Sequence, residues 1–482
     1  MSAPKVCLTI TASTIMEAVH LAKENEPWID LIELRADYLW EDELPRIGEF
    51  PTLVSRPCIL TIRRKRDGGL FEGDDIDRMV LFSEMGNYDY VDLETDLRAP
   101  KLQILAELSR VKIIRSAHYF EPTSPDVILK MDKQVRSPYE IPKVAFTPRS
   151  AADMAELFSK VKQLPKRDRI ICAMGGVGFP SRVLAQRLGS FLTFTSPKKL
   201  STNTAAIGHT DPISLQKIYD FKNISDKTAL CGVTGWPLTV TSSPEVHRKF
   251  YEEENLNALM LPMPAEKIED ALKLAETLEM KGLAVTIPHK EALLPHLDET
   301  DEAVKQIGAA NTVVFKDGKK IGHNTDAPGF AKALKTLMQK DSLKGLLVAV
   351  LGSGGAAKAT AYALYKEGAE TTVFARDLAK AKAVADKFGF AVALLTDLTS
   401  DFKPDIIVQC TSVGLQGSAT EGMDPIPQYE FQGREVLYDI IYKPEATPLM
   451  LRAQKKGCLA SNGLSMLIEQ AKLQHQLFFH TN

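Results

Sequence analysis

Short apolar runs and amphipathic stretches alternate along roughly the first 220 residues of the chain. The runs with strand character are Val6–Ile10, Asp30–Arg35, Ile59–Arg63, Tyr90–Glu94, Lys112–His118, Lys143–Thr147, Arg169–Met174 and Ser190–Thr195. Helical patterns fit between them. The first places Ile15, Val19 and Ala22 on one face, with Ser13 as its expected N-cap. About eight strands, each followed by a helix, are typical of a (β/α)₈ barrel over 1–222, with an open doubly wound sheet as the alternative.

The α/β pattern continues beyond a short polar segment, Phe221–Thr228, that is expected to join two domains. Strand patterns near 230–235, 256–263 and 282–288 alternate with helical patterns that begin near 244 and 268. We therefore predict a second α/β domain over 229–330.

A dinucleotide-binding pattern comes late in the chain. Leu346–Leu351 has the character of a buried parallel strand, and an alanine-rich helix after it ends near Gly368. The turn between them consists of Gly352, Ser353, Gly354, Gly355 and Ala356. Strand, glycine turn and helix in this order let the backbone approach a pyrophosphate at a helix N-terminus. This predicts a Rossmann domain over 331–457, and Leu464–Phe478 is expected to pack back so that 458–482 completes the preceding domain.

Composition narrows the functional classes. The 482 residues carry a net charge of −3 and 44% hydrophobic residues, so binding to nucleic acid or a membrane surface has no electrostatic support. Six scattered cysteines without a C-x-x-C pair predict reduced core thiols. No apolar run is long enough to span a bilayer, and strand character begins within a few residues of the N-terminus. We expect a cytoplasmic protein; its oligomeric state is not predicted.

Charged residues gather where the strands of the predicted barrel end, the face at which barrel enzymes carry out chemistry. They are Glu33, Arg35, Arg63, His118, Lys143 and Arg182. Glu33 and Arg35 are two residues apart on one strand and should share a face. A lysine among apolar residues can attack a ketone, a histidine can move protons, and arginines bind carboxylates. The pattern therefore predicts Schiff-base chemistry on an anionic keto acid.

The same residues lie in motifs that resemble those of the type I 3-dehydroquinate dehydratases. The motifs are Glu33–Asp37, Thr61–Arg63, Ser116–His118, Pro142–Ala145 and Gly176–Arg182, and the match covers nearly all of residues 1–220. The resemblance implies that Lys143 forms an imine with the C3 ketone of the substrate. It also implies that His118 takes the C2 proton and later protonates the departing hydroxide.

By the same resemblance, four residues hold the substrate: Glu33, Arg35, Arg63 and Arg182. Two supporting positions depart from the family pattern. Asp67 stands where the family has a glutamate that orients the histidine, and His209 stands where it has a glutamine that contacts substrate. Ala205 likewise replaces a serine of that loop.

A second group of candidate residues lies ahead of the Rossmann pattern. Lys290 follows a predicted strand, and Asp326 comes about 35 residues later. A lysine and an aspartate within reach can relay a proton while hydride moves elsewhere.

These residues lie in motifs that resemble the shikimate dehydrogenases from about residue 229 to the end. The motifs are Gly235–Pro244, Val285–Lys290, Gly308–Thr312, His323–Ala327, Gly352–Ala359, Cys410–Gly414, Tyr438–Tyr442 and Asn462–Ala471. The resemblance implies that Lys290 and Asp326 are the catalytic pair. It implies substrate contacts from Thr241, Ser243, Thr286, Asn311, Tyr442 and Gln470, and cofactor contacts that include Thr411 and Gly463. Ala284 stands where the family has an asparagine.

Cofactor choice follows from the second strand of the Rossmann pattern, Thr371–Ala375, which ends in Arg376. An acidic residue there would bind the 2′-hydroxyl of NAD, whereas arginine suits the 2′-phosphate of NADP. We expect NADP(H) as cofactor and no metal.

The two families catalyse consecutive steps, because the dehydration product 3-dehydroshikimate is the compound that the second reaction reduces to shikimate. The sequence thus predicts a bifunctional enzyme with these small-molecule substrates. Two alternatives stay open: the barrel is a non-catalytic binding module, or the C-terminal half acts on quinate.

Overall fold

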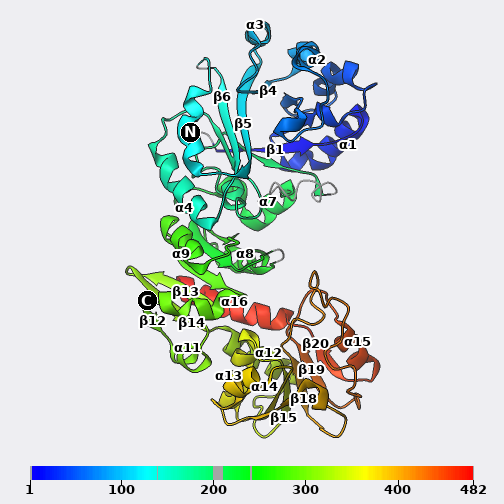
Figure 1. Cartoon of the computed structure of the whole chain (residues 1–482), viewed down its shortest axis with the longest axis vertical. Coiled ribbons are helices and arrows are strands. Elements are labelled where there is room, and N and C mark those ends of the chain that lie inside the picture. Colours follow the sequence, from blue (N-terminus) through cyan, green and yellow to red (C-terminus); the bar gives the residue numbers. More distant parts are fainter. Residues whose placement is uncertain (1–2, 138, 199–209, 239–240, 481–482) are drawn as a thin grey trace. The chain divides into compact units, whose positions relative to one another are not determined.

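The computed structural model describes residues 3–137, 139–198, 210–238 and 241–480. They belong to two compact units, the first formed by 1–244 and 255–280, the second by 245–254 and 281–482 (Figure 1).

The first unit contains a ring of eight parallel strands. They are β1 (Lys5–Ile10), β2 (Leu31–Arg35), β3 (Cys58–Thr61), β4 (Tyr90–Glu94), β5 (Lys112–Pro122), β6 (Ile141–Thr147), β7 (Ile170–Ala173) and β8 (Leu192–Thr195). Each strand from β1 to β6 pairs with the next, and β8 pairs with β1. A single bridge, Arg169 to Ser190, joins the segments of β7 and β8. This nearly closed ring confirms the predicted barrel rather than the open sheet.

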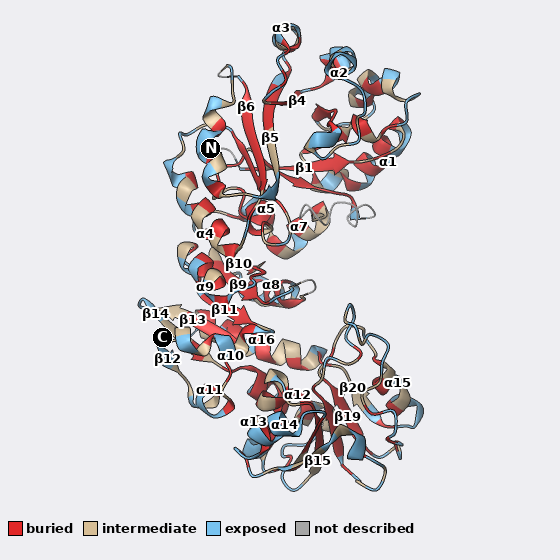
Figure 2. Ribbon diagram, in the orientation of Figure 1, coloured by how far each residue is buried: buried red, intermediate tan, exposed pale blue. Residues whose placement is uncertain are grey.

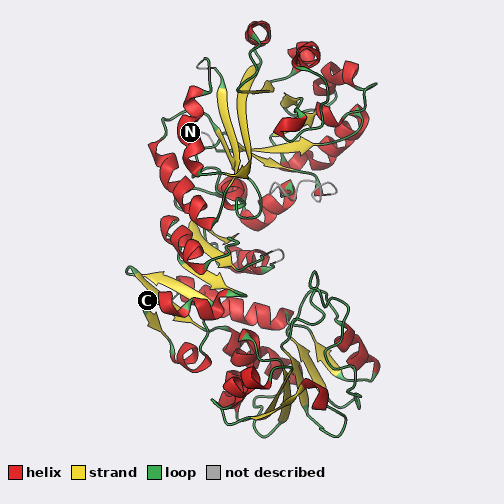
Figure 3. Ribbon diagram, in the orientation of Figure 1, coloured by secondary structure: helices red, strands yellow, loops and turns green. Residues whose placement is uncertain are grey.

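Helices connect these strands and lie outside them (Figure 3). They are α1 (Ile15–Asn25), α2 (Asp75–Phe82), α3 (Pro100–Leu108), α4 (Ala151–Lys160), α5 (Pro180–Val183) and α7 (Pro212–Tyr219). On α1, Ile15, Val19 and Ala22 are buried as predicted. The N-cap is Thr14 and not Ser13, because Thr14 is the last extended residue and its hydroxyl accepts from the Glu17 amide.

Alternate strand residues fill the interior of the barrel. Most of the barrel strands are coloured as buried (Figure 2). They include Cys7, Leu31, Ile59, Tyr90, Ile114, Ile170 and Leu192. All six cysteines of the chain are buried and none forms a disulfide, as predicted. No helix among the described residues has the length and apolar character needed to cross a bilayer.

The first unit also holds β9 (Ala229–Thr234), β10 (Ala258–Pro262) and α9 (Ile268–Thr277). β9 and β10 pair in parallel, and α9 packs against α4 of the barrel. Arg187, which precedes β8, donates to the carbonyls of Thr228, just before β9, and Leu278, just after α9.

The second unit begins with α8 (Ser243–Glu253), whose residues from Glu245 onward belong to it. β11 (Gly282–Val285), β13 (Thr312–Lys316) and β14 (Lys319–His323) pair antiparallel, and β12 (Glu299–Thr300) runs parallel to β14. The short helices α10 (His289–Ala292) and α11 (Glu302–Ile307) accompany these strands.

Two long helices bring the end of the chain back to this part of the unit. They are α12 (Asp326–Met338) and α16 (Leu464–Phe479), which pack against each other. A Cβ at Gly329 would lie 2.8 Å from the Gln470 amide nitrogen, so glycine is needed for this close approach. The predicted return of the C-terminal helix is confirmed.

The remaining sheet of the second unit is a Rossmann fold. Its strands are β15 (Leu347–Leu351), β16 (Glu370–Ala375), β17 (Ala391–Leu394), β18 (Ile406–Gln409), β19 (Val436–Asp439) and β20 (Leu459–Ser461). All are parallel, in the order β17-β16-β15-β18-β19-β20 of dinucleotide-binding folds. The helices of this sheet include α13 (Gly355–Glu367), α14 (Leu378–Ala385) and α15 (Pro448–Lys455). Gly368 ends α13 in the left-handed conformation, as predicted.

Candidate active sites

Lys143 lies inside the barrel on β6, and its side chain is buried. Its Nζ lies 2.8 Å from Asp92 Oδ2 on β4 and 4.3 Å from the centre of the Phe194 ring on β8. The amine is therefore held between a carboxylate and an aromatic face, in a site with little access to water.

Arg63 completes this buried charge cluster. It lies just beyond β3 and not within it, and its guanidinium contacts Asp92 at 2.9 Å and Glu94 at 2.8 Å. Ser116 accepts from Arg63 at 3.0 Å and donates to Asp92. Burial alone would raise the pKa of Asp92, but Arg63 and Lys143 hold it well below its ordinary value.

The other predicted substrate residues lie on neighbouring elements. Glu33 is buried and accepts hydrogen bonds from Thr9 at 2.7 Å and Thr61 at 2.8 Å. Arg35 ends β2 and forms a two-pronged ion pair with Asp37. Arg182 is buried on α5, which follows β7 in the chain.

His118 lies on β5, within electrostatic range of Arg63, Lys143 and Asp92. Burial, reinforced by the two cations, lowers its pKa well below the ordinary value, so the ring is neutral and can accept a proton. Its Nδ1 has no hydrogen bond to any described residue. Asp67, the expected orienting residue, instead accepts from Arg64 Nε at 2.6 Å. His209 and Ala205 lie outside the described residues.

The depressed pKa of His118 predicts the pH dependence of the dehydration reaction. A base must be deprotonated to act, so the acid limb of kcat/KM should have its midpoint below about 6.5, the ordinary value for histidine. Steady-state rates of the intact chain from low to neutral pH measure this. His20→Gln, which removes an exposed histidine of α1, should leave the limb unchanged. A midpoint at or above the ordinary value would contradict the assignment.

The charge cluster also makes a stability prediction. Asp92→Asn would leave Arg63 and Lys143 buried without their shared counter-ion, which should cost about 3–5 kcal/mol of unfolding free energy. Glu72→Gln, which removes the partner of Lys65 in an exposed pair, should change little. Denaturant unfolding followed by circular dichroism compares the two. Equal effects would show that the buried pairing does not stabilise the barrel.

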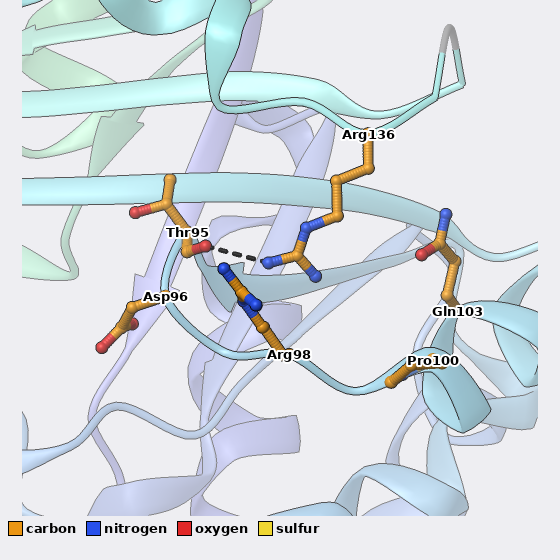
Figure 4. A pocket seen from close by; sticks show the side chains of 6 residues that line it. All are labelled: Thr95, Asp96, Arg98, Pro100, Gln103 and Arg136. Atoms are coloured by element: carbon orange, nitrogen blue, oxygen red, sulfur yellow. Dashed lines mark hydrogen bonds between the residues drawn. The ribbon is translucent and has the colours of Figure 1, made fainter.

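A separate cavity lies next to the end of β4 (Figure 4). It is lined by Thr95, Asp96, Arg98, Pro100, Gln103 and Arg136. Arg136 donates to the carbonyls of Thr95 at 3.0 Å and Leu97 at 3.1 Å, so its guanidinium holds the segment that follows β4. None of the lining residues is a predicted site residue.

The second predicted pair is in contact. Lys290 on α10 lies 2.5 Å from Asp326 Oδ2, at the start of α12. Asn311 donates to the other oxygen of Asp326 at 2.8 Å and lies 3.4 Å from Gln470 Oε1 on α16. Thr325 also contacts Gln470, at 3.2 Å. One hydrogen-bond network thus joins residues from four segments of the unit.

The remaining predicted substrate residues occupy segment ends. The Thr241 hydroxyl accepts from the amide of Ser243, which begins α8. Thr286 is half-buried just after β11, and Tyr442 is half-buried just after β19. Gln470 is buried.

The glycine turn fits a dinucleotide. Gly352 has a φ of +111°, and a Cβ there would lie 3.1 Å from Thr411 Cγ2, so only glycine suits the position. No side chain among the described residues caps α13 at Gly354, which leaves the N-terminal amides of the helix to a bound phosphate. A Cβ at Gly355 would lie 3.8 Å from Lys290 Cδ, so the turn passes close to this lysine. Ser353 and Ala356 are half-buried at this turn.

Two more predicted cofactor residues, Arg376 and Gly463, lie just after strands of the Rossmann sheet or close to the end of one. Arg376 is exposed directly after β16. Its neighbour Asp377 caps α14 by accepting from the Lys380 amide. A side chain at Gly463 would collide with the carbonyl of Ile440, so the chain passes close to the end of β19 there.

The sequence did not reveal which side chains contact Lys143 or join the hydrogen-bond network of Asn311. Asp92 and Glu94 lie in a strand that was identified, and their two-residue spacing was the available signal that both face the interior. Gln474 is buried on α16 and donates to Thr312 at 3.0 Å. It is one helical turn beyond Gln470, which was the corresponding signal.

A barrel with a buried amine, followed by a dinucleotide-binding fold with a lysine–aspartate pair, defines a bifunctional enzyme: a lyase joined to an oxidoreductase. Comparison with protein families agrees. The type I 3-dehydroquinase family matches residues 6–226. The shikimate dehydrogenase substrate binding domain matches 233–313, and shikimate/quinate 5-dehydrogenase matches 333–440.

Relatives extend over both parts. A bifunctional 3-dehydroquinate dehydratase/shikimate dehydrogenase from Arabidopsis thaliana, described as chloroplastic, is 28% identical over 98% of this chain and 81% of its own. The shikimate biosynthesis protein AroDE of Chlamydia pneumoniae is 28% identical over 98% and 95%. An NADP⁺ shikimate dehydrogenase from Caldanaerobacter subterraneus is 36% identical over 53% of this chain and 93% of its own.

A crystal structure of shikimate dehydrogenase in complex with NADP⁺ matches 54% of this chain and 92% of its own, with 31% identity and a TM-score of 0.50. The chain belongs to the type I 3-dehydroquinase family in its N-terminal part and to the shikimate dehydrogenase family in its C-terminal part. Both resemblances predicted from the sequence are confirmed.

Proposed function

We propose that the barrel dehydrates 3-dehydroquinate through an imine on Lys143. The buried contact with Phe194 and Asp92 keeps the amine in place for attack on the C3 ketone. The imine withdraws electrons, and neutral His118 takes the C2 proton. The same histidine then returns the proton to the hydroxyl group that leaves as water. Hydrolysis of the imine releases 3-dehydroshikimate and restores Lys143.

The residues around Lys143 hold the substrate in this proposal. Positive charge for the substrate carboxylate comes from Arg35, Arg63 and Arg182. Glu33 accepts hydrogen bonds from hydroxyl groups of the substrate. Asp67 is a supporting residue by resemblance, and its carboxylate accepts from Arg64. His209 is assigned a lid contact by resemblance alone. The proposed dehydratase domain spans 1–222.

The C-terminal half reduces 3-dehydroshikimate to shikimate. Lys290 donates a proton to the carbonyl oxygen, and Asp326, fixed by Asn311, orients the lysine and restores its proton. A bound NADPH supplies the hydride. Substrate carboxylate and hydroxyl groups are held by Thr241, Ser243, Thr286, Asn311, Tyr442 and Gln470. The reaction needs no metal.

NADP is the preferred cofactor because Arg376 presents a cation at the end of β16 while capping of α14 occupies Asp377. Gly352, Ser353, Gly354, Gly355, Ala356, Thr411 and Gly463 shape the rest of the cradle. Arg376→Ser should raise the KM for NADP about 10- to 100-fold and leave that for NAD nearly unchanged. Arg66→Ser, at an exposed arginine outside the Rossmann domain, is the control. A parallel rise for both cofactors would contradict the assignment.

The single observation that carries the proposal is the presence of two engaged lysine–carboxylate pairs, Lys143–Asp92 and Lys290–Asp326, one in each half. The enzyme acts on small molecules, without nucleic acid or membrane partners, in the cytoplasm. Comparing shikimate with quinate as substrates for NADP reduction tests the choice of acid. Dehydratase turnover by the intact chain separates an active barrel from a binding module.

A further inference from the structure

Two helix ends of the second unit meet at a cluster of potential metal ligands. Glu254 follows α8, His475 lies in the last turns of α16, and His480 follows that helix. One ligand atom from each lies within 4.8 Å of the others. None of the three belongs to either active site.

Both imidazoles converge on the same carboxylate oxygen. Nε2 of His475 and Nε2 of His480 each lie 3.0 Å from Glu254 Oε2. Bonds of about 2.1 Å to a tetrahedral Zn²⁺ place neighbouring ligand atoms roughly 3.4 Å apart. The observed separations therefore need only a small expansion to admit the ion.

The buried histidine, His475, is held in place by its neighbours. His475 is 4% exposed; its Nε2 lies against Glu254, and its Nδ1 makes no hydrogen bond to a described residue. Its ring is held by Phe250, Tyr251 and Phe479, with centroids 5.5, 5.7 and 5.3 Å away. A buried imidazole that is fixed in place with Nε2 against a carboxylate is suited to a metal.

The other two ligands face solvent. Glu254 and His480 are exposed, so an ion can enter, and a water molecule can fill the fourth position. One carboxylate and two imidazoles also match the donor types that Zn²⁺ accepts.

We propose that Glu254, His475 and His480 form a Zn²⁺ site that ties the end of α16 to the end of α8. The site is structural and not catalytic. Its position matters because α16 also carries Gln470 and Gln474, which reach the Asn311 network. No short motif indicates the site, since the three residues are spread over more than 220 positions.

Titration of the metal-free, untagged full chain with Zn²⁺ and with Co²⁺ tests the proposal. We expect one Zn²⁺ per chain, the visible absorption of tetrahedral Co²⁺, and a higher melting temperature in Zn²⁺. Glu254→Gln and His480→Gln, both at exposed positions, should each weaken binding at least tenfold and remove the thermal shift. His20→Gln, at an exposed histidine beside Glu24, should not. Zn²⁺ binding that is absent, or that survives both variants unchanged, would overturn the proposal.

Discussion

Replacing Lys143 by methionine should abolish dehydration of 3-dehydroquinate, with kcat falling about 10⁴-fold or more. Methionine keeps an unbranched apolar stem only one atom shorter than that of lysine, so it fills most of the same space beside Phe194. Asp92 keeps its contacts with Arg63 and Ser116, and we therefore expect the barrel to fold. The loss reflects the missing nucleophile. Dehydratase rates and borohydride trapping of substrate on the chain measure it.

Two controls make the result specific. Lys160→Met removes another paired lysine of the barrel, on α4, and should retain dehydratase activity. Reduction of 3-dehydroshikimate by the Lys143→Met chain should also be normal, since that reaction uses other residues. Dehydration that persists in the variant, or trapping on a different lysine, would refute the imine.

Replacing Lys290 by methionine should lower kcat for shikimate formation by about 10²- to 10⁴-fold, the usual contribution of a positioned general acid. Asp326 would keep its hydrogen bond from Asn311, so the network around it should hold. The rate of NADPH oxidation with added 3-dehydroshikimate measures the loss.

Lys335→Met is the matched control, because Lys335 pairs with Glu367 on the same unit and lies outside the network. It should leave kcat unchanged. If Lys290→Met raised only KM, with kcat intact, the lysine would bind substrate without transferring a proton.

The sequence predicted the parts of the fold that depend on local pattern. The eight apolar runs and the glycine turn can each be recognised from neighbouring residues. The strand orders of the barrel and of the Rossmann sheet confirm the elements predicted from them. The N-cap was placed one residue early because Ser13 and Thr14 are equally suited by type. Only the backbone conformation distinguishes them, and Thr14 is extended immediately before the helix.

The candidate sites were predicted less completely, because partners across strands depend on register. Lys143 was identified, but its carboxylate partner was not: Asp92 reaches it from β4 across the barrel, 51 positions earlier in the chain. Asp67 was assigned by resemblance alone, as the residue that stands where the family has a histidine-orienting glutamate. In the structure its carboxylate accepts from Arg64.

Coupled turnover by the intact chain tests the central claim most directly. Supplied with 3-dehydroquinate and NADPH but no 3-dehydroshikimate, the chain should oxidise NADPH and release shikimate. The Lys143→Met chain should oxidise NADPH only after 3-dehydroshikimate is added. The Lys290→Met chain should convert 3-dehydroquinate to 3-dehydroshikimate and accumulate it. If the unaltered chain left NADPH unchanged with 3-dehydroquinate, while 3-dehydroshikimate supported its oxidation, the account of the barrel would be wrong.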